Sequence, residues 1–333
     1  MVLKLALVGY GYWGPNLARN FSKLPDAEVH YVVDSDEKKR ERAKKEYPHA
    51  HTSASLEQVL SKVDAVLIAT PPKTHFALAK LALEAGKHIL VEKPVTTTAK
   101  EARELEALAK EKNRIAMIDY TFIYVDHVRY IKKLLDSGEM GKIASFYFQR
   151  QGIDFLRRDV NVVDDLLPHD LSMLVYWMGE KATRAKTVLA AGKSHFITEI
   201  EDEAISYLDF GDFTASMLVS CLSPVKVRKV LIIGDKKMVE FDDTKLSDKV
   251  AVHDKEIRAP LEAPTSYWDF LVKCRRGSTT LPYVPSREPL ANMAAHFVDC
   301  VKNKKKPDTD ISFGVIVTEL MERINNTVRK GRG

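Results

Sequence analysis

Cysteine is scarce in this sequence: its 333 residues include three, Cys221, Cys274 and Cys300, which are widely spaced. An odd number at such spacing fits neither a disulfide framework nor a zinc pattern, and it favours a reducing cytoplasm. Long apolar runs are missing too, since none approaches the ~20 residues that a helix needs to cross a bilayer. The apolar start leads directly into a glycine loop, so we expect a buried strand there rather than a signal peptide, and no membrane association.

An excess of charge of one sign is also lacking. Lys and Arg number 51 and Asp and Glu number 46, for a formal net charge of +5, and the two signs are interleaved. The densest basic clusters, at residues 38–42 and 304–306, favour solvated surface over a nucleic-acid patch, so we expect no nucleic-acid partner. The mild positive excess would still attract an anionic metabolite. No Gly-x-Ser-x-Gly nucleophile elbow is present.

The first third of the chain alternates strands rich in Val, Ile and Leu with amphipathic helices. This rhythm predicts an α/β fold whose N-terminal Rossmann domain is a doubly wound parallel sheet covered on both faces. After about residue 120, successive strands predict a C-terminal α/β domain with a mostly antiparallel open sheet. We therefore expect two domains, 1–120 and 121–333, as the length suggests. The expected strands are 3–8, 29–33, 65–69, 89–91, 115–118, 143–150, 205–210, 214–221 and 229–233, and the expected helices are 12–24, 36–46, 74–84, 98–110, 130–135, 164–177, 288–301 and 314–328.

A glycine loop follows the first expected strand. Gly9-x-Gly11-x-x-Gly14 alone is a weak pattern, but a helix follows it and Asp34 stands at the end of the next strand. In such a loop the first glycine allows a tight turn, the second lets the backbone approach a pyrophosphate, and the third packs the helix whose amides hold the phosphates. Asp34 can bind both ribose hydroxyls and would repel a 2′-phosphate, which favours NAD over NADP.

A second loop, Thr70-Pro71-Pro72, follows another buried strand, and His75 starts the next helix. Its prolines make a rigid loop that could line a cofactor cleft. The residues fit an ordinary strand-to-helix turn equally well, and both interpretations stay open.

Lys93 and His169 are the candidate proton-transfer residues. Lys93 ends an apolar strand, and Pro94 after it restricts the lysine backbone to extended conformations. Lys93 could be an ordinary solvated surface lysine without a role in the reaction. An ammonium group beside a reacting hydroxyl, however, can act as a proton donor. His169 follows Asp165 by one helical turn, so the carboxylate can orient the imidazole, while Pro168 is expected to disrupt the helix locally.

Metal chemistry finds little support in the sequence. Asp165 and His169 could supply two ligands, but no further histidine or cysteine has convincing spacing, so we expect no metal.

Together these motifs resemble the Gfo/Idh/MocA oxidoreductase family over essentially the whole chain. The resemblance rests on the glycine loop, Thr70-Pro71-Pro72 with His75, Glu92-Lys93-Pro94, and the Asp165-x-x-x-His169 helix. It implies an NAD-dependent dehydrogenase acting on CH–OH groups. Lys93 would contact the reacting hydroxyl, His169 would exchange its proton, and Asp165 would orient His169 or hold a neighbouring hydroxyl. The expected cofactor-binding residues are Gly9, Gly11, Tyr12, Trp13, Gly14, Asp34, Ser35, Thr70, Pro71, His75, Glu92 and Lys93.

Three further segments narrow the resemblance to family members that oxidise nucleotide-linked amino sugars. The segments 9–21, 160–162 and 167–172 are similar to UDP-N-acetylglucosamine and UDP-N-acetylglucosaminuronate 3-dehydrogenases of surface-polysaccharide pathways. By this resemblance the substrate ligands are Lys93, Arg150, Asn161, Asp165 and His169, with Arg157 or Arg158 meeting a carboxylate or diphosphate. Ser172 is usual in that branch, whereas Leu167 is larger than the residue often found there. Asp119, at the end of the last first-domain strand, is an extra carboxylate that would alter charge preference near the nicotinamide or substrate.

Two other functions are compatible with the sequence. One is a dehydrogenase of a free sugar or cyclitol such as inositol. The other is a non-catalytic NAD-binding sensor or corepressor, against which intact Lys93 and His169 argue. The resemblance also implies a homodimer or homotetramer in which the second-domain sheet packs between subunits.

Overall fold

The computed structural model describes residues 2–153, 160–196, 198–258 and 273–331. The chain forms two compact units. The first comprises Met1–Val125 and Arg287–Glu322, and the second comprises Asp126–Ser286 and Arg323–Gly333.

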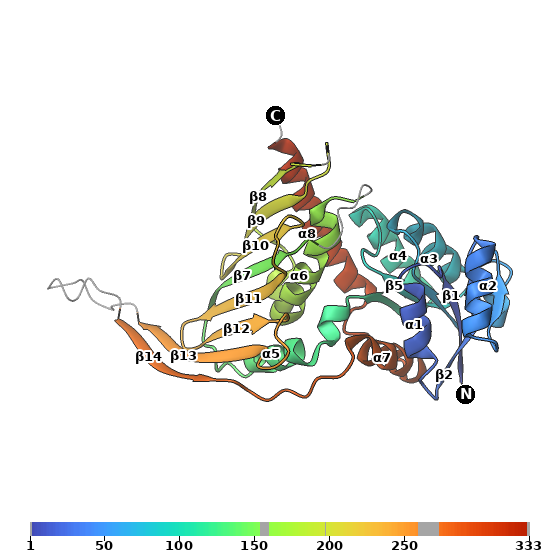
Figure 1. Ribbon diagram of the computed structural model, residues 1–333, viewed down its shortest axis with the longest axis horizontal. Coiled ribbons are helices and arrows are strands. Elements are labelled where there is room, and N and C mark those ends of the chain that lie inside the picture. The colour runs from blue at the N-terminus through green and yellow to red at the C-terminus, as the bar shows by residue number, and fades with distance from the viewer. Residues whose placement is uncertain (1, 154–159, 197, 259–272, 332–333) are drawn as a thin grey trace. The chain divides into compact units, whose positions relative to one another are not determined.

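A six-stranded sheet forms the centre of the first unit (Figure 1). All its described pairs are parallel. Its central strands are buried on both faces, and Leu5, Leu7 and Leu67 expose none of their surface. The parallel, doubly wound prediction is therefore confirmed. In spatial order the strands are β3 (His51–Ser53), β2 (Ala27–Val33), β1 (Leu3–Val8), β4 (Ala65–Ile68), β5 (His88–Glu92) and β6 (Ala116–Asp119).

The helices between these strands begin close to their expected starts. Asp36 caps α2 by accepting a hydrogen bond from Lys38 N–H, and Thr98 caps α4 by accepting one from Glu101 N–H. Each cap satisfies an amide that the first helical turn leaves without a partner. The bounds are α1 (Gly14–Phe21), α2 (Glu37–Glu46), α3 (His75–Glu84) and α4 (Ala99–Glu111), with 3₁₀ turns at Leu60–Lys62, Pro72–Thr74 and Thr121–Tyr124.

Two late helices, α7 (Pro289–Asn303) and α8 (Ile311–Lys330), were expected in the C-terminal domain. Arg287–Glu322 instead groups with the first unit, so the expected division at residue 120 differs from the structure over this segment. The Phe21 ring of α1 meets the Phe297 ring of α7 edge-on at 6.0 Å, and the two helices lie side by side in Figure 1. Thr309 Oγ1 also donates to the Ile118 carbonyl at 2.7 Å. These contacts join segments that lie far apart in the sequence.

An eight-stranded sheet forms the second unit, and only its β7–β10 pair is parallel. The mostly antiparallel prediction is therefore confirmed. In spatial order the strands are β14 (Lys273–Thr280), β13 (Val250–Arg258), β12 (Met238–Asp242), β11 (Val227–Gly234), β7 (Ile143–Gln151), β10 (Thr214–Ser220), β9 (Glu203–Asp209) and β8 (Thr187–Lys193).

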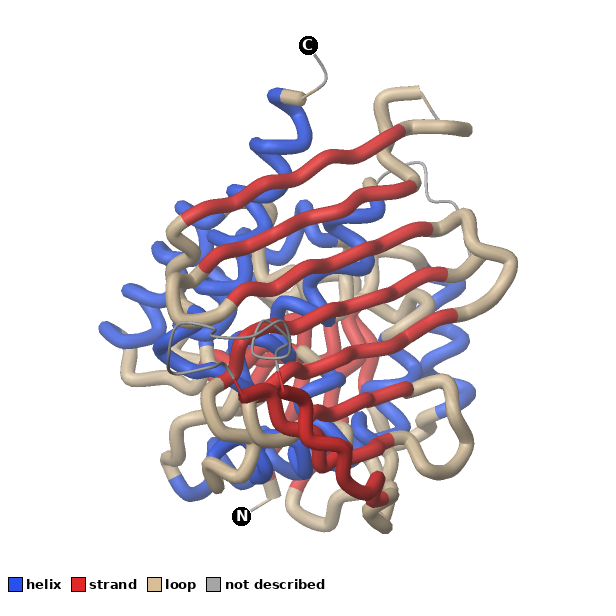
Figure 2. Tube along the Cα trace, turned by 90° about the vertical axis from the view of Figure 1, so that its left-hand side faces the viewer, coloured by secondary structure: helices blue, strands red, loops and turns tan. Residues whose placement is uncertain are grey.

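One face of this sheet is covered by α6 (Val162–Met178), which is followed by a 3₁₀ turn at Gly179–Ala182, and α5 (Asp126–Asp136) packs against α6. The core between the sheet and these helices stacks Phe146 and Phe148 on Trp177, whose indole N–H donates to the Val128 carbonyl at 3.0 Å. Figure 2 looks onto the other face, where no described helix of this unit lies. The expected local disruption at Pro168 was wrong, because α6 continues through that residue. Proline removes one helical hydrogen bond, and burial of Leu167, Pro168 and Leu171 holds the helix together around it.

Truncation of the second-unit core should be costly. Phe148 is 1% exposed, so Phe148→Ala removes a full aromatic contact and should lower the free energy of unfolding by about 3–5 kcal/mol. Leu246→Ala is the matched control, because Leu246 is fully exposed and its loss should cost less than about 0.5 kcal/mol. Urea denaturation of both variants measures the difference, and equal costs would contradict this packing.

Candidate cofactor and catalytic site

The glycine loop at the end of β1 is shaped by two close backbone approaches. Gly9 has φ +95°, and a Cβ there would meet the Ala69 carbonyl oxygen at 2.6 Å. A Cβ on Gly14 would overlap the Gly9 carbonyl oxygen. At Gly11, by contrast, an added Cβ would meet nothing within 4 Å. The first and third glycines are therefore required by the chain itself, whereas the second leaves open space beside the backbone.

This loop lies where a nucleotide-binding sheet accepts its ligand. β1 pairs with β2 on one side and with β4 on the other, so the strand order reverses at the carboxyl end of β1. Helix α1 starts there with no side-chain cap, and Pro15 in its first turn lacks an N–H. A helix start without a side-chain cap is suited to a phosphate, and the space at Gly11 gives a pyrophosphate close access. The residues present thus fit NAD.

Asp34 is fixed beside the same loop. Its carboxylate accepts the Tyr10 N–H at 2.8 Å and the Asp36 N–H at 3.0 Å, and Lys39 Nζ lies 3.8 Å away. Arg40 donates to the carbonyl of Ser35 at 2.9 Å, which fixes the backbone after Asp34. The predicted ribose-binding carboxylate is therefore held in place by its own backbone surroundings.

His75 connects two loops at the carboxyl edge of the sheet. The ring is fully buried, with Nε2 2.7 Å from the Thr70 carbonyl oxygen and Nδ1 2.8 Å from the Pro94 carbonyl oxygen. Burial lowers the pKa of His75, while the hydrogen bonds to the two carbonyls, both of which only the protonated ring can donate at once, raise it. The Thr74 hydroxyl also donates to the Pro71 carbonyl at 2.8 Å. This histidine therefore holds the end of the Thr70 loop against the loop that carries Lys93, a role that its sequence position did not reveal.

Lys93 follows β5 directly, and the Lys93–Pro94 peptide is cis. Its backbone N–H donates to Glu92 Oε2 at 3.1 Å. Glu92 is paired in register with Asp119, the last residue of β6. The Asp119 carboxylate accepts the Thr121 hydroxyl at 2.8 Å and lies 3.4 Å from the Trp13 indole nitrogen. Trp13, Glu92, Lys93 and Asp119 are thus brought together at one edge of the sheet.

The second unit holds the other predicted catalytic residues. Asp165 and His169 are both half-buried and lie one turn apart on α6, so their side chains share a helix face. The Ser172 hydroxyl donates to the His169 carbonyl at 2.8 Å.

Two predicted substrate ligands have structural contacts of their own. Arg150 is 5% exposed and forms a buried ion pair with Asp170, at 2.7 Å. Asn161 caps α6 by accepting the Asp164 N–H at 2.8 Å, and its amide lies 3.2 Å from both Glu201 and Asn325 oxygens. Both side chains stabilise the second unit. The positions of these residues in the sequence could not reveal these contacts.

Tyr12 is 89% exposed, with its ring 6.4 Å from that of Trp13. Arg157 and Arg158 lie outside the described residues.

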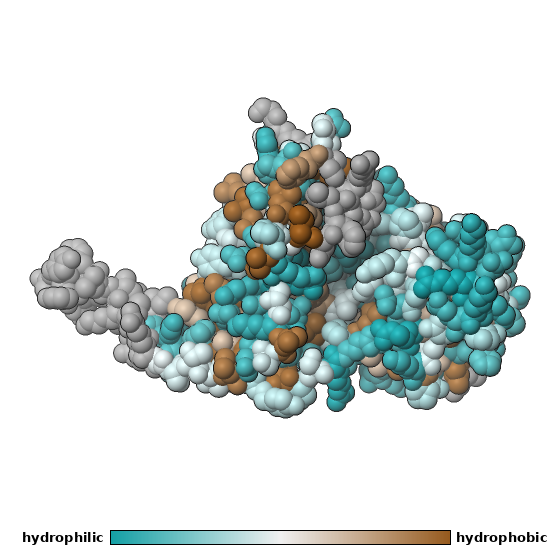
Figure 3. All heavy atoms as spheres, in the orientation of Figure 1, coloured by the Kyte–Doolittle hydropathy of each residue, from teal (hydrophilic) through white to brown (hydrophobic). Residues whose placement is uncertain are grey.

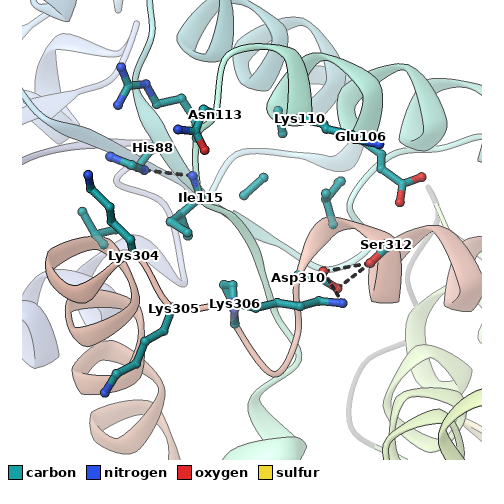
Figure 4. Close-up of a pocket in the computed structure, with 16 residues that line it drawn as sticks. His88, Glu106, Lys110, Asn113, Ile115, Lys304, Lys305, Lys306, Asp310 and Ser312 are labelled. Atoms are coloured by element: carbon teal, nitrogen blue, oxygen red, sulfur yellow. Dashed lines mark hydrogen bonds and ion pairs between the residues drawn. The ribbon is translucent and has the colours of Figure 1, made fainter.

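A cavity of about 530 Å³ opens at the opposite edge of the first unit's sheet, where β5 and β6 begin (Figure 4). Two of its lysines are paired with acids: Lys305 with Asp299 at 2.9 Å and Lys306 with Asp310 at 3.1 Å. Because the glycine loop and Lys93 follow the carboxyl ends of the strands, this cavity is separate from the cofactor edge.

Among the described residues, no three His, Cys, Asp or Glu side chains converge as metal ligands would. None of the helices described combines the length and apolar content of a membrane span.

Residues 3–120 match the family model described as the oxidoreductase family with an NAD-binding Rossmann fold. The chain is 35% identical to the uncharacterized oxidoreductase YdgJ of Escherichia coli over 147 residues, 43% of this chain and 42% of that protein. It is 26% identical to UDP-N-acetylglucosamine 3-dehydrogenase of Acidithiobacillus ferrooxidans over 221 residues, 66% of each chain. These matches cover less than two thirds of either relative's length. It is also 25% identical to scyllo-inositol 2-dehydrogenase (NAD⁺) of Bacillus subtilis over 97% of this chain and 91% of that protein.

Solved structures with the same fold include two sugar-nucleotide enzymes. UDP-N-acetylglucosamine 3-dehydrogenase GnnA from Acidithiobacillus ferrooxidans superposes with a TM-score of 0.81 at 21% identity, covering 98% of both chains. The WlbA dehydrogenase from Bordetella pertussis, in complex with NADH and UDP-GlcNAcA, superposes with a TM-score of 0.80 at 18% identity, covering 99% of this chain and 98% of that one. At these identities the likeness shows the fold.

The different surroundings of Gly11 and Gly14 predict different losses on substitution. Gly11→Ala should leave stability nearly unchanged and weaken NAD binding, because the new methyl group occupies the space beside the loop. Gly14→Ala should lower both stability and NAD affinity, because its methyl group overlaps the Gly9 carbonyl. Calorimetric titration with NAD and thermal unfolding of each variant measure the two effects. Full NAD affinity in Gly11→Ala would contradict the assigned pyrophosphate position.

Three observations point to the same cofactor: the parallel sheet with its reversed strand order, the glycine loop beside Asp34, and the family match over residues 3–120. The first unit is therefore an NAD-binding Rossmann domain, and residues 3–120 are similar to that domain of the Gfo/Idh/MocA oxidoreductase family.

Proposed function

We propose that this enzyme oxidises a secondary hydroxyl of a nucleotide-linked amino sugar, at C3 of UDP-N-acetylglucosamine or of its uronate, for surface-polysaccharide synthesis. The position of Lys93 is the observation that carries the chemistry. It directly follows β5 at the carboxyl edge of the sheet, the same edge that carries the glycine loop. The substrate class is supported by the similarity to UDP-N-acetylglucosamine 3-dehydrogenase and by the fold shared with WlbA. The three widely spaced cysteines favour the cytoplasm as its location.

In this proposal two side chains handle the hydroxyl. Bound NAD supplies the acceptor for the hydride and its two electrons. The Lys93 ammonium donates a hydrogen bond to the hydroxyl oxygen and stabilises the negative charge that develops there as the proton leaves. His169 accepts that proton, and Asp165, one turn earlier on α6, orients the imidazole. A ketone remains on the sugar.

The alternative substrate is a free cyclitol. It is favoured by one observation, the similarity to scyllo-inositol 2-dehydrogenase over 97% of this chain. Lys93, His169 and Asp165 would have the same roles in that reaction, so the choice between substrates depends on residues that bind beyond the reacting carbon.

Nicotinamide absorbance with three substrates separates these functions. In the presence of the purified enzyme, NAD should be reduced by UDP-N-acetylglucosamine or UDP-N-acetylglucosaminuronate and not by myo-inositol. Lys93→Met should lower turnover by at least about 100-fold while NAD affinity stays near wild type, because the ammonium acts on the hydroxyl. Lys100→Met, at an exposed position of α4, is the control and should retain activity. Reduction of NAD by inositol alone would show that the substrate is a cyclitol. Binding of NAD without its reduction by any of the three substrates would favour the non-catalytic sensor.

We also propose a homodimer or homotetramer assembled through the uncovered face of the eight-stranded sheet. Exposed apolar side chains lie in register across it: Leu189 faces Tyr207 on the neighbouring strand, and Tyr147 lies in the same row. Ile205 is exposed in the adjacent row. Figure 3 shows apolar residues gathered over the part of this unit where β8 to β10 lie. Contiguous apolar surface of this kind is typical of a subunit interface.

A charge placed in this row should break the assembly. Tyr207→Asp should reduce the molar mass measured by light scattering from that of an oligomer to about that of one chain, because a buried unpaired carboxylate opposes association. Leu246→Asp, at a fully exposed position outside the sheet face, should leave the mass unchanged. A monomeric wild type, or equal masses for the wild type and Tyr207→Asp, would contradict this interface.

A further inference from the structure

Asp119 and Glu92 form a pair of carboxyl groups at the carboxyl edge of the first unit's sheet. They are paired in register on neighbouring parallel strands, so their side chains project from the same face. Asp119 is 1% exposed, and Oε1 of Glu92 is also buried. The two carboxyl groups are close enough for each to influence the pKa of the other.

The hydrogen bonds around this pair leave one oxygen without a donor. Asp119 accepts from the Thr121 hydroxyl and the Trp13 indole, and Glu92 Oε2 accepts from the Lys93 N–H. Glu92 Oε1 receives no N–H or O–H from any described residue. Neither carboxylate can donate to the other, so a proton between them is the group that satisfies this oxygen.

Electrostatics favours the same arrangement. Burial, and then the neighbouring Asp119, raise the pKa of Glu92 well above its usual value, while Lys93 opposes the rise. Burial raises the pKa of Asp119, against hydrogen bonds from Glu92, Thr121 and Trp13 and the charge of Lys93. Among the described residues, Lys93 is a charged group that acts on both carboxyls. Two adjacent buried carboxyls do not both ionise readily, and one proton is retained.

We propose that Asp119 is a positioning residue that shares one proton with Glu92, so that the pair holds a single negative charge facing the Lys93 ammonium while fixing the Trp13 indole at the cofactor loop. The part that concerns catalysis rests on the proposed function, in which the Lys93 ammonium donates to the reacting hydroxyl. The single charge of the pair favours the protonated form of Lys93, and Asp119 ties the β1 loop to the end of β6 through Trp13.

Amide substitutions separate one shared charge from two independent charges. In Asp119→Asn, Glu92 ionises and the new amide donates to it, so the pair keeps its single charge. In Glu92→Gln, Asp119 ionises in the same way. The double variant E92Q/D119N has no charge. If the pair holds one charge, each single variant should retain the wild-type pH profile of kcat/KM. The double variant alone should shift that profile to lower pH, because it removes the negative charge that the pair places near the Lys93 ammonium.

Infrared spectroscopy tests the proton itself without any substrate. Wild type at pH 7 should show the carbonyl band of a protonated carboxylic acid, and both single variants should lose it. Asp202→Asn is the control and should keep the band, because hydrogen bonds from His195 and Phe196 lower the pKa of that carboxyl despite its burial.

Stability gives a second readout that is independent of activity. The folded-state pKa of the shared proton lies above the unfolded value, so its stabilisation is complete below the unfolded pKa and is lost as pH rises through the folded pKa. The urea midpoint of wild type should therefore fall with rising pH relative to that of the double variant.

The shared proton would be overturned if the wild type lacked the infrared band. It would also be overturned if the pH profile of kcat/KM shifted as far in Asp119→Asn as in the double variant. If the enzyme oxidises none of the sugars tested while the band behaves as expected, the proposed function fails and the shared proton stands.

Discussion

Close backbone contact between the β1 loop and the end of β4 is the constraint on which the first unit depends. Gly9 can sit against the Ala69 carbonyl, and Gly14 against the Gly9 carbonyl, because neither carries a Cβ. This contact sets where α1 starts, and the helix begins without a side-chain cap at the point where the strand order reverses. An anion-binding helix start and an open backbone at Gly11 follow from it.

The carboxyl edge of this sheet is then organised by buried polar groups rather than by apolar packing. His75 holds the Thr70 and Pro94 carbonyls together, and Asp119 reaches the indole of Trp13. Buried polar groups that find partners fix geometry, because any displacement leaves one of them unsatisfied. The loop that carries Lys93 is therefore held by side chains from separate segments of the chain, which suits the role that we propose for its ammonium.

The sequence was sufficient for the sheet architectures and for the glycine loop, because strand burial and glycine spacing are local patterns. It missed contacts between distant segments. The hydrophobic pattern of α7 predicts a helix, but only its packing of Phe297 on Phe21 assigns it to the first unit. Arg150 and Asn161 had the chemistry of ligands, yet Arg150 pairs with Asp170 and Asn161 caps α6. Asp119 was recognised as unusual, whereas its contact with Trp13 required the fold.

The central claim is hydride transfer from C3 of a UDP-linked amino sugar to NAD. The most direct test is to supply UDP-N-acetylglucosamine and UDP-N-acetylglucosaminuronate, each deuterated at C3, and to measure the mass of the reduced nicotinamide. Our account predicts that the reduced cofactor formed from at least one of them carries the deuterium. Reduced cofactor without deuterium, or no reduction by either sugar, would contradict it.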